Sequence, residues 1–162
     1  MSLADSREWM DQADHDLAAA RFLLGDPPGP GYADWVCFAA QQAGEKAVKA
    51  VRLVLGSRIE DLMTVQGKDR KSGPGHDLGL LFGPLLGLLT NPDPKIAEAF
   101  QLTDYEQQAR YPGIRGQSGR APCHAFSEAA ALRAVENAER LVSFCHALHA
   151  DVEKVWKDRS SP

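Results

Sequence analysis

Apolar side chains recur every three or four residues along most of the chain, which predicts a helical protein. The first apolar stripe consists of Trp9, Ala13, Leu17, Ala20 and Leu24. Gly25 and a proline- and glycine-rich run at 27–31 follow it, and we expect them to end the first helix because proline cannot continue it.

A second helix is expected from about Tyr32 to Leu55, with Gly56 as its C-terminal cap. Its apolar side consists of Val36, Ala39, Ala40, Ala43, Ala47, Ala50, Val51 and Val54. Its polar side consists of Gln41, Gln42, Glu45, Lys46, Lys49 and Arg52. The pattern leaves three roles open for this polar side, which can face solvent, a partner chain or an anionic ligand.

Polar and loop-forming residues separate the next predicted elements. Residues 57–75 are expected to form a long loop. A short third helix is predicted at about 76–89, where Pro84 indicates a kink or an early end. A fourth helix is predicted at about 95–108.

The C-terminal part of the chain begins with a glycine-rich segment, 109–124, which is expected to be an irregular loop. Ser127 is a good N-cap for a final helix of about 30 residues. The apolar stripe of that helix consists of Ala138, Leu141, Val142, Cys145, Leu148, Val152 and Trp156. With no internal repeat and no strand pattern, the sequence predicts one domain over 1–162, an all-α antiparallel up-and-down bundle of four or five helices.

The charge distribution restricts the function classes. The 162 residues carry a formal net charge of −4, which argues against a general nucleic-acid coat protein, because nonspecific binding needs a basic surface. Basic residues are nevertheless concentrated locally. Residues 46–71 contain seven Lys or Arg against three acidic residues, and residues 110–120 contain three Arg and no acid. A local anion-binding site is therefore compatible with the acidic chain.

The three cysteines, Cys37, Cys123 and Cys145, are widely spaced. They form no CxxC pair, so a thiolate zinc site and a disulfide framework are not expected. No apolar run reaches the roughly 18 residues of a membrane span, and the first residues lack the apolar segment of a secretory signal. We therefore expect a cytoplasmic protein that does not insert into a membrane.

A set of motifs resembles the HEPN domain family over about residues 6–157. The matching residues are Trp9, Ala13, Asp16-Leu17 and Ala20, then Tyr32, Phe38, Gln41-Gln42, Glu45-Lys46 and Lys49-Ala50, and finally His76-Asp77-Leu78 and Arg110-Tyr111-Pro112. The resemblance implies an all-α bundle of four or five helices, usually a homodimer, and many members are encoded beside a minimal nucleotidyltransferase as a two-gene module. Some members of the family are metal-independent endoribonucleases, which carry an Arg followed after four to six residues by a His.

That catalytic pair is not clearly present. Arg110 stands at the family position of the Arg, but the next histidine, His124, is too distant. Arg120 and His124 are one residue too close. Arg140 and His146 satisfy the spacing, yet they lie about 120° apart around the predicted final helix. Whether the chain is an enzyme therefore stays open, with Arg110, His124, Arg140 and His146 as the catalytic candidates.

The candidates for phosphate or nucleotide binding are Lys46, Lys49, His76, Arg110, Arg115 and Arg120. The guanidinium of Arg110 suits phosphate, but it could instead cap the fourth helix or pair with Glu45 or Asp104. His76 could contact a phosphate, or it could cap or pack against the third helix.

Two further groups have alternative interpretations. His146 and His149 are three residues apart on the final helix and could share a metal, although no third ligand is near in sequence. Trp9, Trp35 and Phe38 could stack on a nucleobase, or they could form core or dimer contacts. We expect neither a resident metal nor a cofactor.

The sequence thus favours a noncatalytic HEPN-like module that binds the phosphate of a nucleotide or RNA, or that docks a nucleotidyltransferase. The alternative is a metal-independent endoribonuclease of the toxin–antitoxin type.

Overall fold

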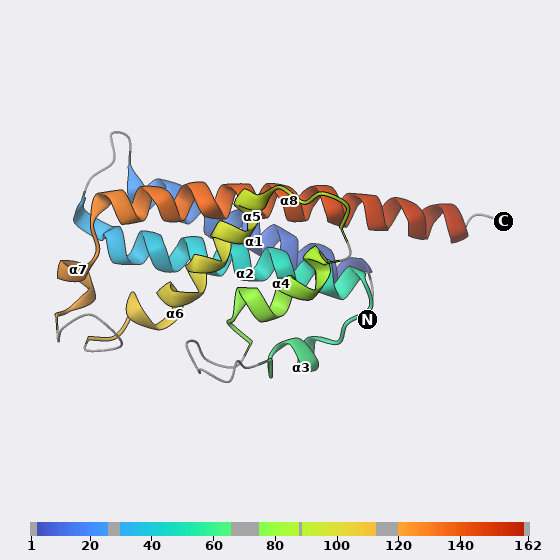
Figure 1. Ribbon diagram of the computed structural model, residues 1–162, viewed down its shortest axis with the longest axis horizontal. Helices are drawn as coiled ribbons and strands as arrows, with labels where there is room; N and C mark the ends of the chain where they lie inside the picture. Colours follow the sequence, from blue (N-terminus) through green and yellow to red (C-terminus); the bar gives the residue numbers. More distant parts are fainter. Residues whose placement is uncertain (1–2, 26–29, 66–74, 88, 113–119, 161–162) are drawn as a thin grey trace.

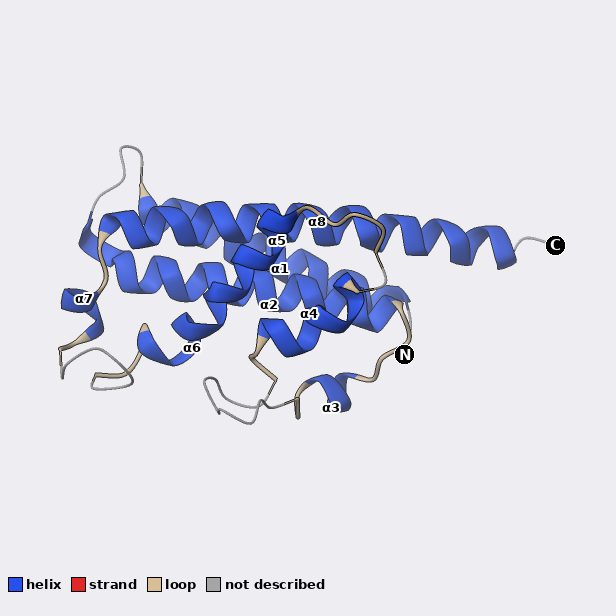
Figure 2. Ribbon diagram, in the orientation of Figure 1, coloured by secondary structure: helices blue, strands red, loops and turns tan. Residues whose placement is uncertain are grey.

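Three long helices form the frame of the molecule: α1 (Leu3–Leu24), α2 (Ala33–Val54) and α8 (Glu128–Ser160) (Figure 1). The computed structural model describes residues 3–25, 30–65, 75–87, 89–112 and 120–160. These residues form helices and connecting turns without any strand (Figure 2), which confirms the predicted all-α class. None of the described helices is both long enough and apolar enough to cross a membrane.

The predicted stripe of α1 faces the core. Ala13, Leu17, Ala20 and Leu24 are buried, and Trp9 is partly buried against them. The helix ends where expected, because Gly25 adopts a φ of 77°, a left-handed conformation that glycine accepts without steric cost.

Helix α2 lies at the centre of the fold and packs against α1, α8 and the shorter elements beside it. Its close approach to α8 is possible because Gly44 has no side chain, and a Cβ there would lie 3.0 Å from Leu141. Because several elements pack around α2, they cover part of its polar side as well as its apolar side. Three residues of its predicted polar side, Gln41, Glu45 and Lys49, are buried, so that part of the helix does not face solvent.

The segment between α2 and the next helix contains more structure than a loop. A short helix, α3 (Ile59–Leu62), lies inside the predicted loop 57–75, where its Leu62 is only 1% exposed. Helix α4 (Leu78–Leu86) is shorter than the predicted 76–89 and continues for two residues past Pro84.

The predicted fourth helix at 95–108 is divided into three pieces. These are α5 (Pro94–Glu98), the 3₁₀ helix η2 (Ala99–Asp104) and α6 (Tyr105–Gln108). Within η2, the hydroxyl of Thr103 accepts a 3.0 Å hydrogen bond from the backbone N–H of Leu78, which joins this segment to the start of α4. The 3₁₀ segment that interrupts the predicted helix is therefore also the part that contacts α4.

Two more short elements lie in regions that the sequence marks as irregular. A 3₁₀ turn, η1 (Pro30–Tyr32), leads into α2, and α7 (Pro122–Ala125) lies within the predicted loop 109–124. A proline occupies the first position of each, which suits its fixed φ.

Helix α8 begins as predicted, because the side chain of Ser127 accepts a 3.2 Å hydrogen bond from the backbone N–H of Ala130. The first part of its stripe, which includes Leu141 and Cys145, is buried. Its last turns extend beyond the ends of the neighbouring helices (Figure 1), and Trp156 there is 54% exposed. The stripe is therefore core only as far as the bundle reaches.

Candidate functional site

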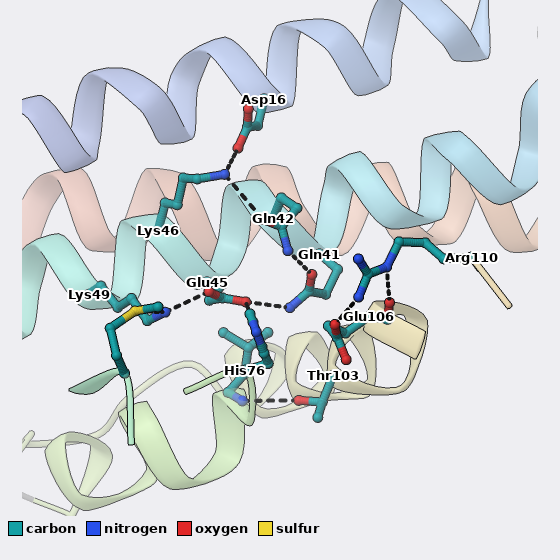
Figure 3. Close-up of polar contacts among 12 residues, drawn as sticks. Asp16, Gln41, Gln42, Glu45, Lys46, Lys49, His76, Thr103, Glu106 and Arg110 are labelled. Carbon is teal, nitrogen blue, oxygen red and sulfur yellow. Dashed lines mark hydrogen bonds and ion pairs between the residues drawn. The ribbon is translucent and has the colours of Figure 1, made fainter. Parts of the chain in front are cut away.

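The central feature of the candidate site is a buried carboxylate, Glu45, on α2 (Figure 3). Its Oε1 accepts a 2.6 Å hydrogen bond from Nζ of Lys49, one helical turn later. Its Oε2 lies 2.8 Å from Nε2 of Gln41 and 2.8 Å from Nδ1 of His76, which precedes α4. Glu45 and Lys49 are 3% and 0% exposed, so this is an ion pair inside the protein.

The surroundings of this carboxylate favour its charged form. Burial acts to raise the pKa of Glu45, but hydrogen bonds and positive charges from His76 and Lys49 outweigh it and hold the pKa below its ordinary value. Lys49 is further enclosed by Sδ of Met63, 3.2 Å from its Nζ, and by the Trp9 ring, whose centroid is 5.5 Å away. The network therefore buries the Glu45–Lys49 pair, while His76 at its edge reaches the surface.

A chain of hydrogen bonds leads from Gln41 to the first helix. Gln42 donates to Oε1 of Gln41 over 2.7 Å, and Oε1 of Gln42 accepts from Nζ of Lys46 over 3.2 Å. Lys46 also binds the carboxylate of Asp16 on α1 (Figure 3). The predicted phosphate ligands Lys46 and Lys49 thus each already have an acidic partner, which is Asp16 of α1 for Lys46 and Glu45 of α2 for Lys49.

His76 has a different role from the predicted helix cap. The N-cap of α4 is Asp77, whose Oδ1 accepts a 3.1 Å hydrogen bond from the backbone N–H of Leu80. The His76 side chain is 27% exposed and is oriented by Glu45 through Nδ1. Among the described residues, nothing forms a hydrogen bond with its Nε2, so this nitrogen can meet a ligand.

Arg110 follows α6, where it contacts both protein backbone and aromatic rings. Its Nε donates a 2.8 Å hydrogen bond to the backbone carbonyl of Glu106, and its Nη2 binds the Glu106 carboxylate. The guanidinium carbon lies 4.9 Å from the ring centroid of Phe38 and 5.0 Å from that of Tyr111. Arg110 therefore satisfies a helix carbonyl, as one interpretation predicted, but its acidic partner is Glu106 instead of Glu45 or Asp104.

Arg110 keeps capacity for an additional acceptor. Its side chain is 31% exposed, and the contacts that it makes with described residues leave Nη1 without a hydrogen bond. Phe38, Gln41, Glu45 and Lys49 occupy one face of α2 at helical spacing. The Arg110 and His76 contacts with that face are therefore about two helical turns, or roughly 10 Å, apart.

The remaining predicted phosphate ligands are the two other arginines of the 110–120 segment. Arg120 is exposed immediately before α7. Arg115 lies outside the residues that the structure describes, so its position relative to Arg110 stays a prediction.

The candidate catalytic residues on α8 have separate partners in the described structure. His146 on α8 binds the carboxylate of Asp14 on α1, at 2.8 and 3.0 Å. Arg140 donates a 3.1 Å hydrogen bond to Asn137 of its own helix. His124 is exposed on α7. The residues Arg140 and His146 therefore have separate partners, as their angular separation around α8 requires.

A serine, a histidine and a glutamate meet between α1 and α8 in the order of a hydrolytic triad. Nε2 of His149 lies 2.9 Å from Oγ of Ser6, and Nδ1 of His149 lies 3.5 Å from Oε1 of Glu153. Ser6, however, is fully buried and donates its hydroxyl hydrogen to the carbonyl of Leu3. His149 must then donate to Ser6 instead of accepting its proton, which is the opposite of a nucleophile–base pair. This cluster joins two helices.

The two histidines of α8 have different partners. His146 faces Asp14 and His149 faces Ser6, and the described residues contain no group of three or more His, Cys, Asp or Glu side chains that could hold a metal ion.

The three aromatic candidates for base stacking differ in exposure. Trp9 covers Lys49 and lines a shallow groove with Glu8, Gln12 and Lys46. Trp35 is 51% exposed and touches Phe38 edge to face. The stacking interpretation therefore applies to Trp35 more readily than to Trp9.

Sequence reasoning did not identify the central role of Glu45 or the participation of Glu106. The sequence did contain a local indication of the Glu45 network. Gln41, Glu45 and Lys49 follow one another at intervals of four residues, the spacing at which helical side chains interact. The bond from His76 to Glu45 had no local signal, since 31 residues separate them.

The fold and the motifs have counterparts among known proteins. A family model described as HEPN domain matches residues 6–148. The crystal structure of TT1696 from Thermus thermophilus is 27% identical with a TM-score of 0.68, over 88% of this chain and 97% of that chain. The structure of ST0689, an archaeal HEPN homologue, is 26% identical with a TM-score of 0.62, over 89% of this chain and 97% of that chain. No curated protein matches the chain.

Proposed function

The chain belongs to the HEPN domain family, and from that premise we propose that it is a noncatalytic module that binds the phosphate of a nucleotide or RNA at Arg110. The observation that carries the proposal is the fixed position of the Arg110 guanidinium. Glu106 and the rings of Phe38 and Tyr111 hold it, while its side chain stays 31% exposed. A pre-positioned guanidinium binds phosphate with little loss of conformational freedom.

The other predicted ligands support this site unequally. Arg120 is exposed and Arg115 lies in the same arginine-containing segment, so both are proposed as additional phosphate contacts. His76 is proposed as a neighbouring contact through Nε2. Lys46 and Lys49 are engaged by Asp16 and Glu45, and we propose that they maintain the α2 face on which the site is built.

A direct test compares the binding of a short fluorescently labelled oligoribonucleotide to the wild type and to Arg110→Gln. Because a hydrogen bond to a charged group contributes about 1.5–3 kcal/mol, we expect Arg110→Gln to weaken binding by about tenfold or more. Arg140→Gln, the same change at a partly exposed arginine on α8, is the matched control. Equal affinities for the wild type and a folded Arg110→Gln protein would reject the site.

We also propose the assembly that the family implies, a homodimer that docks a nucleotidyltransferase. An apolar groove at the end of α1 supports a protein contact, because Phe22 is 85% exposed there and lines the groove with Leu132 and Val135 of α8. Sedimentation of the wild type and of Phe22→Ser tests the dimer, and a Phe22→Ser protein of unchanged mass would exclude this groove as its interface.

A metal-independent endoribonuclease is the second candidate function, and the orientation of His76 favours it. Glu45 holds Nδ1, which leaves Nε2 placed to exchange a proton with a ligand, as in other carboxylate-oriented imidazoles. This function predicts RNA cleavage in the presence of EDTA that is lost in His76→Ala and retained in His124→Ala. RNA that stays intact with the wild-type protein would remove it.

A further inference from the structure

Aromatic rings and one guanidinium form a continuous row at the end of α2 nearest α6. Trp35 and Phe38 meet edge to face, with ring centroids 6.1 Å apart. Arg110 lies over Phe38 at 4.9 Å and over Tyr111 at 5.0 Å. The four side chains, which we call the aromatic row, thus link α2 to the segment after α6.

Both ends of the aromatic row are open to solvent. Trp35 is 51% exposed and Tyr111 is 49% exposed, whereas Phe38 between them is partly buried. A large exposed ring that a neighbouring ring holds in place offers a flat apolar surface at low entropic cost. Trp35 packs against Phe38, and Tyr111 packs against Arg110, so each exposed ring has a neighbour in the row.

Positive charge reaches the surface near the row, where the carboxylates of Asp34 and Glu106 are buried and that of Asp104 is exposed. Arg110 is partly exposed, and Arg133 of α8 is exposed. Arg133 lies close enough to Cys37 of α2 for its charge to act on that thiol. Burial and the charge of Asp34 raise the pKa of Cys37 to about 12, and the charge of Arg133 acts in the opposite direction. Asp34 and Glu106 are only 7% and 4% exposed.

From this arrangement we propose that the aromatic row binds unpaired bases of single-stranded RNA by stacking on Trp35 and Tyr111. This inference rests on the proposed function, and it adds the base as the second element that the site recognises. Stacking on aromatic rings or on arginine is the usual way in which proteins hold splayed-out RNA bases, and it contributes about 1–3 kcal/mol per base. A chain with a net charge of −4 gains little from long-range attraction to phosphate, so base contacts become important.

The experiment compares two ligands that carry the same phosphates. A ten-residue oligoadenylate and an abasic oligonucleotide of the same length are titrated into the full chain, and affinity is measured by fluorescence anisotropy of a terminal dye. The comparison is repeated with Trp35→Leu and Tyr111→Leu. Trp156→Leu is the matched control, since Trp156 is 54% exposed near the C-terminal end of α8.

We expect the wild type and Trp156→Leu to bind oligoadenylate at least about tenfold more tightly than the abasic strand. Trp35→Leu should reduce that preference to about one- to threefold without changing the affinity for the abasic strand. Tyr111→Leu should reduce the preference to a similar extent and should also weaken binding of the abasic strand, because Tyr111 helps to hold Arg110. If both strands bind the wild type equally, the stacking inference is wrong while phosphate binding survives. If neither strand binds, the proposed function itself fails.

A second copy of this chain is the competing occupant of the aromatic row. Sedimentation of Trp35→Leu and Tyr111→Leu distinguishes it, because both variants should retain the wild-type mass if the row binds RNA. A shift of both variants to a smaller mass, with oligoadenylate affinity unchanged, would assign the row to an interface and overturn the inference.

Discussion

At the residue scale, Glu45 decides how the site is organised. Three side chains converge on its carboxylate, and two of them, Lys49 and His76, come from elements on either side of the 57–75 segment. A buried ion pair contributes little net stability compared with apolar packing, but removal of one partner is costly because the other charge stays buried. We infer that the pair fixes the geometry around His76 more than it stabilises the fold.

The first prediction concerns this pair. Lys49→Met should lower the free energy of unfolding by about 3–5 kcal/mol, because it leaves Glu45 with His76 as its remaining basic partner. The double variant Glu45→Gln/Lys49→Met should lose much less, since neither buried charge remains. Urea denaturation measures both, with Lys46→Met as the control at the more exposed pair with Asp16. A double variant as unstable as the single one would contradict this account.

The residues of the site show what the sequence can and cannot predict. The helical spacing of Gln41, Glu45 and Lys49 predicted that they share one face, and they do. It could not predict that the face is buried, because His76 and Met63, which close over it, are brought there by the tertiary fold. Arg110 was identified from a motif, but its partner Glu106 became evident only from the geometry.

At the element scale, the long helices followed from local pattern because each has a periodic stripe and a local end signal. Gly25 and Gly56 have positive φ values of 77° and 96°, and Ser127 caps α8. The division of segment 95–108 into three pieces could not be predicted from local pattern. The division at η2 accompanies the hydrogen bond between Thr103 and Leu78, which are 25 residues apart. A pattern read from a short stretch of sequence includes only one of these two residues.

Contacts between α1 and α8 lead to a prediction about pH. Hydrogen bonds from Arg7 lower the pKa of Glu153 to about 2, against an ordinary glutamate value of roughly 4.3. The stabilisation is fully present above about pH 4.3 and is lost as the pH falls toward 2, because the unfolded chain takes up the proton first. Glu153→Gln should therefore be less stable than the wild type at pH 6, and the difference should shrink by pH 3.

Urea denaturation at several pH values measures this difference. Glu60→Gln, at an exposed pair with Arg58, is the control and should change stability little at pH 6. A Glu153→Gln deficit that stays constant from pH 6 to pH 3 would show that the pair with Arg7 does not set the pKa of Glu153.

Another prediction concerns the turn that closes the segment over the site. Gly75 has a φ of 77°, and a Cβ there would lie 2.8 Å from backbone atoms of Met63. Gly75→Ala should lower the free energy of unfolding by about 2 kcal/mol or more, from backbone strain plus this contact. Gly56→Ala is the matched control, because its φ is also positive but no atom lies within 4 Å of the added Cβ. Equal losses in thermal and urea denaturation would mean that the contact with Met63 is not maintained.

At the scale of the whole molecule, α2 connects the frame to the site. It packs against α1 and α8, and the shorter elements cover the face that carries Phe38, Gln41, Glu45 and Lys49. His76 and Arg110 meet that face from two different segments, about two helical turns apart. The central claim is that this arrangement presents Arg110 and the aromatic row to RNA.

Heteronuclear NMR of the full chain, labelled at arginine and tryptophan and titrated with oligoadenylate, tests that claim most directly. We predict that the Arg110 Nε–H signal and the Trp35 indole signal shift together and saturate at one ligand concentration. The Arg7 and Trp156 signals should stay in place, because Arg7 is held by Glu153 and Trp156 lies near the C-terminal end of α8. An Arg110 signal that does not move while the ligand binds elsewhere would contradict the account.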